Sequence, residues 1–264
     1  MSEIKILYLG DVVGRSGRLA IIHHLSAIRK LHDIDFVIAN VENASMGAGI
    51  TKEHAEELHH AGVDLMTLGD HVWDRFGFEQ AIDGLDYICR PANLPADCPG
   101  RIFVSGKCQN MTIGVSVVLG RTFMKINGYC PFMATDAILA QHRSEVDVMF
   151  LEMHAEATSE KIAYGRVYDG KVTAIVGSHT HVQTADDGLL PKGSAYITDL
   201  GMSGPHDSVL GRELAPVVHA MRTSMPQKFE VATKDVRLSG VVVTVGAAGS
   251  GLPSKITRFH TKVV

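Results

Sequence analysis

The first 70 residues alternate short apolar runs with amphipathic stretches, and this alternation constrains the fold more than any other feature of the chain. Apolar runs of strand length occupy residues 4–9, 35–39 and 63–68. Between them, residues 18–32 place leucine or isoleucine at three-residue steps, which is typical of one helical face, and residues 51–61 form a second helical segment. This β-α-β-α-β order predicts parallel strands joined by right-handed crossovers.

The remainder of the chain is richer in strands than in helices. Helices are predicted at residues 135–142 and 213–223. A parallel first half and a strand-rich second half predict an α/β fold in which two sheets stack and helices cover the outside. We expect a single domain over residues 1–264, because no linker, repeat or low-complexity segment interrupts the chain. Strands of this second part are expected at residues 102–104, 111–119, 146–151, 173–176, 195–198, 229–232, 236–245 and 255–261.

Composition argues against several classes of protein. The formal net charge is −4, from 25 basic and 29 acidic residues without a basic tract, which argues against a protein that coats nucleic acid but allows a nucleotide-sized substrate. No apolar run approaches the roughly 18 residues that span a bilayer, and the run at residues 4–9 is too short for a signal-peptide core. The four cysteines have no CxxC spacing, so we expect reduced thiols in a cytoplasmic protein and no cysteine-ligated zinc.

Side chains that can bind a metal ion follow five of the predicted strands. In α/β sheets, ligands bind at the carboxyl ends of strands, where the backbone turns away and side chains converge. Five strands that end in this way are more than a chance placement of polar residues. The residues concerned are Asp11, Glu42 and Asn43, Asp70 and His71, Glu152 and His154, and His179 and His181.

The ligand types indicate which metals such a site would take. Carboxylate and amide oxygens combined with imidazole nitrogens suit Mn, Fe, Co or Zn better than Mg or Ca. Six or seven candidate ligands are too many for one tetrahedral ion and suit two adjacent ions. Two cations roughly 3.5–4 Å apart need a bridging carboxylate, clamp a phosphate and activate a water molecule between them.

Each of these residues also has an interpretation without a metal. Asp11 and Asp70 could cap helices that follow them, and Glu42 could belong to a turn. His154 taken alone is more often a core histidine than a ligand. The His-x-His pair is the strongest single element, because alternating histidines that leave a strand can bind two different metals. Nine other histidines are interpreted as solvated surface residues: His23, His24, His32, His54, His59, His60, His142, His219 and His260.

The order Gly-Asp, Glu-Asn, Gly-Asp-His, His and Gly-x-His-x-His resembles the calcineurin-like metallophosphoesterases. Within them, it is most similar to the bacterial single-domain 2′,3′-cyclic nucleotide phosphodiesterases that also regulate gene expression. In this branch Val13 stands where the wider superfamily usually has a metal-binding histidine. The resemblance spans most of the chain and is carried by residues 10–14, 41–44, 153–160, 177–186, 189–193 and 198–202.

This resemblance implies a four-layer α/β/β/α sandwich of two mixed sheets. It also implies a dinuclear centre of iron, for which manganese is a common substitute. The ligands that it implies are Asp11, Asn43 and His181 for the first metal, Asp70, His154 and His179 for the second, and Glu42 as the bridge between them.

The same resemblance gives His71 a separate role, as the proton donor to the leaving oxygen. The substrate would then be a small phosphate ester, above all a cyclic nucleotide, attacked by hydroxide formed from a water between the metals. The chain departs from the family at Asp70, where many relatives carry Asn. An aspartate still offers an oxygen ligand, so the departure changes the charge balance of the site.

Several finer points stay open. Asp199 and Glu152 are candidates for the groups that hold the ligand imidazoles in one tautomer. Arg121 is either a phosphate contact or a partner in a surface ion pair. The sequence also leaves open whether the chain forms a homo-oligomer.

Two other classes of protein compete with this interpretation. A metal-dependent amidohydrolase also uses a His-x-His pair, but there the pair normally lies on the first barrel strand, where this chain has Asp11. A regulatory or signalling module could keep the metal site and act through protein or RNA interaction, and the family's regulatory role leaves this alternative open.

Overall fold

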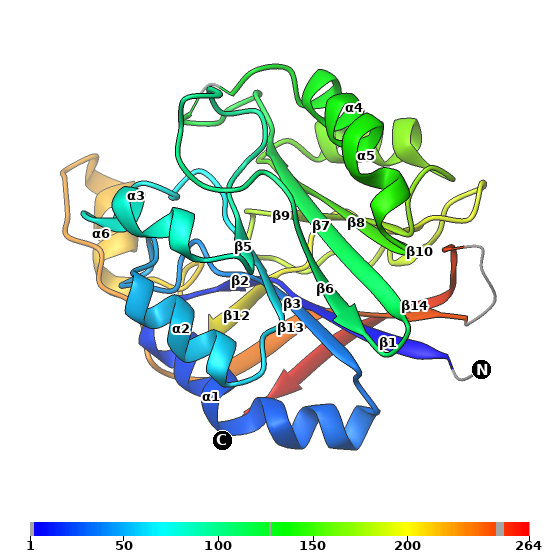
Figure 1. The fold of residues 1–264 in the computed structure, drawn as a ribbon. Coiled ribbons are helices and arrows are strands. Elements are labelled where there is room, and N and C mark those ends of the chain that lie inside the picture. Colours follow the sequence, from blue (N-terminus) through cyan, green and yellow to red (C-terminus); the bar gives the residue numbers. More distant parts are fainter. Residues whose placement is uncertain (1–2, 127, 247–250, 264) are drawn as a thin grey trace.

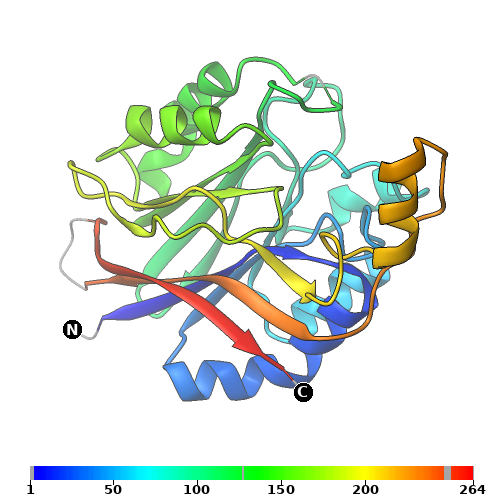
Figure 2. The same ribbon diagram turned by 180° about the vertical axis from the view of Figure 1, so that it is seen from behind.

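The computed structural model describes residues 3–126, 128–246 and 251–263. Its strands form two stacked sheets, and helices lie on the outer face of each sheet (Figures 1 and 2). The architecture is therefore the predicted α/β/β/α sandwich of two mixed sheets. None of the helices within the described ranges is long and apolar enough to cross a membrane.

The first sheet contains the strands of the β-α-β-α-β opening, which pair in parallel as predicted. Antiparallel strands from the end of the chain extend the sheet on the other side of the first strand. Its parallel part is β1 (Ile4–Leu9), β3 (Phe36–Asn40), β4 (Leu65–Thr67) and β5 (Ile88–Cys89). The extension is β13 (Val236–Val245), which pairs with β1, β14 (Pro253–Lys262) and β12 (Met202–Pro205), and β12 pairs in parallel with β2 (Asp11–Val12).

The second sheet comes from the middle of the chain and is parallel in its centre. An antiparallel strand closes each edge. The strands in spatial order are β6 (Val104–Cys108), β7 (Met111–Leu119), β8 (Val148–His154), β9 (Ala174–Ser178), β11 (Ala195–Ile197) and β10 (Gly188–Leu189).

Helices form the outer layers. The Thr51 hydroxyl caps one of them by accepting the backbone N–H of His54 at 3.3 Å. Helix α6 projects beside the sheets (Figure 2). The helices are α1 (Gly14–His32) and α2 (Lys52–His60) on the first sheet, α4 (Pro131–His142) and α5 (Thr158–Tyr168) on the second, and α3 (Phe78–Ala81) and α6 (Leu214–Thr223) at the side, with short 3₁₀ turns at Ile82–Gly84 and Arg143–Glu145.

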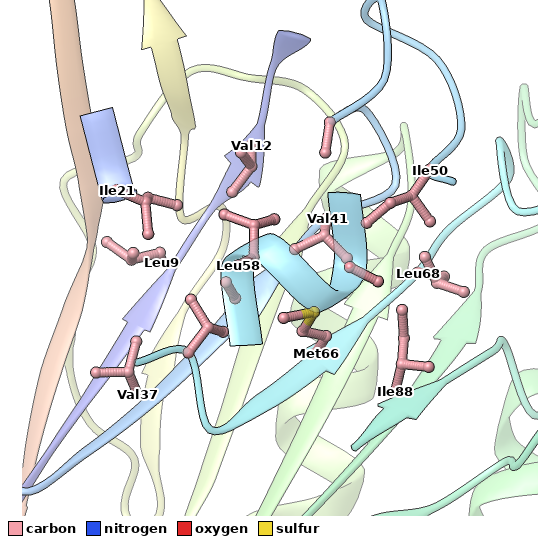
Figure 3. Close-up of a cluster of buried hydrophobic side chains, with 14 of the residues drawn as sticks. Leu9, Val12, Ile21, Val37, Val41, Ile50, Leu58, Met66, Leu68 and Ile88 are labelled. Carbon is pink, nitrogen blue, oxygen red and sulfur yellow. The ribbon is translucent and has the colours of Figure 1, made fainter. Parts of the chain in front are cut away.

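Three hydrophobic layers hold the sandwich together. One lies between the first sheet and helices α1 and α2, where Ile21 and Leu58 pack on strand residues such as Val37 (Figure 3). The second lies between the sheets and the third beneath α4 and α5. Leu7 and Leu9 belong to the first layer, whereas Ile4, Ile6 and Tyr8 of β1 belong to the second. Burial on both faces explains why the strand is a continuous apolar run.

Some local predictions were wrong. Residues 229–232 do not form a strand, and Val231 makes only an isolated bridge to Arg212. Helix α5 was not predicted, because its buried face includes Lys161 and Gly165 and so lacks apolar periodicity. His54 is not simply a solvated residue, since its Nδ1 lies 2.6 Å from the Ser45 hydroxyl.

Candidate metal centre

Four of the predicted ligands form a compact group at the edge where the two sheets meet. One donor atom from each of Glu42, Asp70, His154 and His179 lies within 4.8 Å of the others, and we call this group the ligand cluster. The two carboxylates follow β3 and β4 of the first sheet, whereas His154 ends β8 and His179 follows β9 of the second sheet. The carboxyl ends of strands from both sheets therefore build one site.

The donor atoms of the ligand cluster face one another at short distances. His154 Nε2 lies 3.0 Å from Asp70 Oδ1 and 3.1 Å from Glu42 Oε1. His179 Nδ1 lies 3.2 Å from the same Asp70 oxygen. All but His179 are buried. The arrangement brings oxygen and nitrogen donors together out of water, as a metal site requires.

The other three predicted ligands lie beside the cluster, around Asn43. Asn43 Nδ2 is 2.9 Å from Glu42 Oε1, 3.5 Å from Asp11 Oδ1 and 3.3 Å from His181 Nε2. His181 Nε2 and Asp11 Oδ1 are 3.8 Å apart. Glu42 therefore contacts both groups of residues, as the predicted bridging carboxylate would.

Negative charge dominates this site. Burial opposes the charged form of Asp70, but hydrogen bonds with His154 and His179 outweigh it and hold the pKa of the carboxyl well below its usual range. Burial likewise opposes ionisation of Glu42, and the charge of His154 lowers its pKa overall. Burial favours the neutral form of His154, yet Glu42 and Asp70 raise its pKa well above the usual value. The site therefore favours a positively charged group or ion between its carboxylates.

Gly69 keeps open the space between the ligands. A Cβ atom at this position would lie 2.3 Å from Glu42 Oε2 and 2.4 Å from His154 Nε2. Any other residue would therefore push a side chain into the centre of the ligand cluster. The open space, the excess of buried carboxylates and the mixed oxygen and nitrogen donors together fit transition-metal ions.

The His-x-His turn has an unusual backbone. His179 and His181 have φ values of 94° and 63°, in the left-handed region that residues other than glycine rarely adopt. The residue between them, Thr180, donates its N–H and its hydroxyl to Asp199 Oδ2 at 3.1 and 2.7 Å. The same Asp199 oxygen accepts from the buried Lys161 ammonium at 2.7 Å. Asp199 thus holds the backbone of the turn through Thr180.

Neighbouring groups orient two of the predicted ligand imidazoles. His154 Nδ1 lies 2.8 Å from the Ser178 hydroxyl, which donates to Glu152 Oε1 at 2.5 Å. His181 Nδ1 lies 3.1 Å from the carbonyl oxygen of Leu210. Both contacts leave Nε2 of the ring for the site. Glu152 Oε1 lies 3.8 Å from His154 Nδ1 and therefore orients this ring through the Ser178 hydroxyl.

Glu152 is the centre of a buried network that joins the sheets. Besides Ser178, its carboxylate accepts hydrogen bonds from Asn40 at 2.7 Å, from Thr67 at 2.5 Å and from the Tyr8 hydroxyl. Burial opposes its charge, but the nearby His154 and the hydrogen bonds from these neighbours lower its pKa overall. A fully buried carboxylate with this many donors is held in one orientation.

His71 has contacts that differ from those of the ligands. Its backbone N–H donates to Glu42 Oε2 at 2.9 Å, while its ring Nδ1 lies 2.7 Å from Asp74 Oδ2. The side chain is 30% exposed and lines a pocket beside the ligand cluster. A partly exposed imidazole, oriented by a carboxylate, is suited to transfer a proton.

The pocket has a volume of about 280 Å³ and opens directly onto the predicted ligands. Leu210 and Arg212 were not predicted to belong to the site, because they belong to no motif and to none of the predicted strand ends. Arg121 does not line the pocket, and its backbone N–H donates to Glu160 at 3.1 Å. The lining residues are Glu42, Asn43, Gly47, His71, Glu156, His179, Thr180, His181, Leu210 and Arg212.

The interpretations of two aspartates as helix caps are wrong. Asp11 lies in β2, and Val13 occupies the N-cap of α1. The first helix after Asp70 begins at Phe78. A stack of two sheets also differs from the barrel of the amidohydrolases.

Two stacked sheets with carboxylate, amide and imidazole donors at their shared edge define a metallophosphoesterase. The pattern of the family described as YmdB-like protein matches residues 7–259, and the chain belongs to this family. A 2′,3′-cyclic-nucleotide 2′-phosphodiesterase of Bacillus subtilis is 39% identical over 242 residues, which are 92% of this chain and 91% of that protein.

Two solved structures are similar over nearly their whole length. A phosphatase from Mycoplasma pneumoniae has a TM-score of 0.92 and 32% identity, and the match covers 99% of this chain and 94% of that one. A protein of Thermus thermophilus described as hypothetical has a TM-score of 0.91 and 36% identity, covering 98% and 99%. The chain is accordingly a hydrolase of phosphoric esters.

Proposed function

We propose that the chain is a dinuclear metal-dependent phosphodiesterase that hydrolyses 2′,3′-cyclic nucleotides or similar small phosphate esters. The observation that carries the proposal is the position of Glu42, in contact with His154 on one side and Asn43 on the other. The name of the Bacillus subtilis relative supports the cyclic nucleotide as substrate.

Seven side chains would hold the two ions, with iron as the native metal and manganese as its substitute. When bound, the ions clamp the phosphate and lower the pKa of the attacking water. The ligands would be Asp70, His154 and His179 for one ion, Asp11, Asn43 and His181 for the other, and Glu42 for both.

His71 completes the reaction by protonating the ribose oxygen that leaves phosphorus. Asp74 accepts the N–H of Nδ1 and so holds the ring, and the proton that is transferred is that of Nε2 in the doubly protonated imidazolium. A positioned general acid of this kind contributes a factor of about 10²–10⁴ to the rate. Residues 1–264 act as one catalytic domain, and the free thiols at Cys89, Cys98, Cys108 and Cys130 support a reducing, cytoplasmic setting.

Metal analysis together with turnover tests the proposal. Protein purified without chelator should contain about two equivalents of transition metal, mainly iron, and should open adenosine 2′,3′-cyclic phosphate. Glu42→Gln should lower the content of both metals and abolish turnover, whereas Glu53→Gln, an exposed change in α2, should alter neither. One zinc per chain would contradict the dinuclear scheme. Two metals without turnover of any phosphate ester would favour the regulatory module.

A further inference from the structure

Arg212 forms part of the wall of the pocket that contains Glu42 and His179. Backbone carbonyl oxygens hold its guanidinium group: those of Met46 at 3.1 Å, of Phe229 at 3.4 Å and of Gly47. An arginine has five N–H donors, so these three contacts leave two for a ligand. The guanidinium is therefore fixed in place before any ligand arrives.

The charge of Arg212 is uncompensated within the described part of the chain. Burial lowers its pKa, and the charged neighbour that acts on it, Arg75, lowers the pKa further. Arg75 is held in turn by the carbonyl oxygen of Ala48 at 2.6 Å, on the same loop that Arg212 binds. Two positive groups thus lie near each other beside the pocket, and an anion would relieve their repulsion.

Exposed apolar residues either adjoin these arginines in the sequence or contact them. Phe76, next to Arg75 in sequence, is fully exposed, and Met46 is 71% exposed. Phe229, whose carbonyl oxygen binds Arg212, is 44% exposed. Fixed positive charge interleaved with exposed aromatic rings is how proteins bind single-stranded nucleic acid, because phosphates pair with the charges and bases stack on the rings.

We propose that Arg212, supported by Arg75, is a second anion site that binds the 5′-phosphate of the nucleotide whose cyclic phosphate lies at the metal centre. This inference rests on the proposed function. In a nucleotide chain the 5′-phosphate is the next anion along the backbone from the reacting phosphate. The enzyme then acts on the 3′ end of an RNA strand in preference to the free cyclic mononucleotide. Cleavage of RNA by attack of a 2′-hydroxyl is the class of reaction that supplies such ends.

Binding measurements on metal-loaded protein test this site without turnover. The probes are two dinucleotides that end in a non-hydrolysable 3′-methylenephosphonate, one with a normal phosphodiester linkage and one with a neutral methylphosphonate linkage. By titration calorimetry at low salt, the charged linkage should bind about tenfold more tightly, and added salt should reduce the difference. Equal affinities would overturn the proposal.

Variants then assign the effect to the arginines. R212Q should make the two affinities equal, and R75Q should reduce the difference between them. R212K should keep only part of the difference, because the ammonium retains the charge but cannot bind the three carbonyl oxygens as the planar guanidinium does. The matched control is R166Q, an exposed change on the far helix α5, which should keep the full difference. If R212Q and R75Q both keep the wild-type preference for the charged linkage, the second anion site would be refuted. If the protein opens no cyclic phosphate but still binds the charged linkage about tenfold more tightly, the proposed function would be refuted and the second anion site would not.

Discussion

His71 Nδ1 lies 2.7 Å from Asp74 Oδ2, within the loop that joins β4 to α3. The contact orients the ring, whereas the backbone N–H of His71, which binds Glu42 at 2.9 Å, is independent of the side chain. The proposed proton donor should therefore be separable by mutation from the proposed metal ligands.

His71→Ala should keep both metals and lower kcat on a cyclic nucleotide by a factor of about 10²–10⁴. Asp74→Asn should lower it less, because the ring remains but loses its orientation. Both losses should shrink on a nitrophenyl ester, whose leaving group needs no proton. Steady-state kinetics on the two substrates, with metal analysis of each variant, checks this. An equal loss on both substrates would mean that His71 has a structural role.

Asp70→Asn should stay active with a lower KM and weaker metal binding. The change removes one negative charge from the site, and a charge a few ångströms away contributes on the order of 1–4 kcal/mol, depending on screening. An anionic substrate is then repelled less, while the ion loses a carboxylate ligand. Kinetics and metal content after dialysis test both effects. An inactive variant that still holds two metals would show that Asp70 has another role, such as accepting a proton.

Glu152→Gln should destabilise the metal-free protein by about 3 kcal/mol, because an amide cannot accept all the hydrogen bonds that converge on this buried carboxylate. The pKa of Glu152 is lower in the folded protein than its ordinary value of 4.5. Its stabilising effect is therefore complete above pH about 4.5 and is lost as the pH falls through the folded pKa.

Urea unfolding at several pH values measures this difference between wild type and Glu152→Gln. The difference should be constant near neutral pH and should shrink below pH about 4.5. The exposed change Asp97→Asn serves as the control and should have little effect. A difference that grows in acid would show that Glu152 is protonated in the folded protein.

Lys161→Met should destabilise the protein by about 3–5 kcal/mol, because it leaves the buried Asp199 carboxylate without its cation. Metal affinity should fall as well, since Asp199 holds Thr180 between the two histidines. Thermal unfolding and metal titration measure the two effects, with the exposed Lys30→Met as control. Unchanged metal affinity in Lys161→Met would show that the turn does not depend on this ion pair.

The sequence predicts those parts of the fold and of the site whose residue types follow a local pattern along the chain. Apolar runs buried on both faces, such as β1, and polar residues at strand ends, such as Asp70, follow directly from the β-α-β order. The grouping of these residues at one edge followed because carboxyl ends of parallel strands lie together.

The parts that could not be predicted depend on tertiary contacts. Helix α5 buries Lys161, whose ammonium is satisfied only by Asp199, 38 residues away. Arg212 reaches the pocket because it binds carbonyl oxygens of Met46 and Gly47, more than 160 residues earlier. Local periodicity in the sequence cannot reveal such contacts, because each partner comes from a distant part of the chain.

The two sheets contribute the predicted ligands almost equally: Asp11, Glu42, Asn43 and Asp70 come from the first, and His154, His179 and His181 from the second. An ion bound by residues of both sheets would cross-link the two halves of the sandwich, as a covalent bond between them would. Its binding free energy then adds to the free energy of unfolding, since the separated sheets cannot bind it. Removal of a bound metal ion should therefore lower the free energy of unfolding of the whole sandwich.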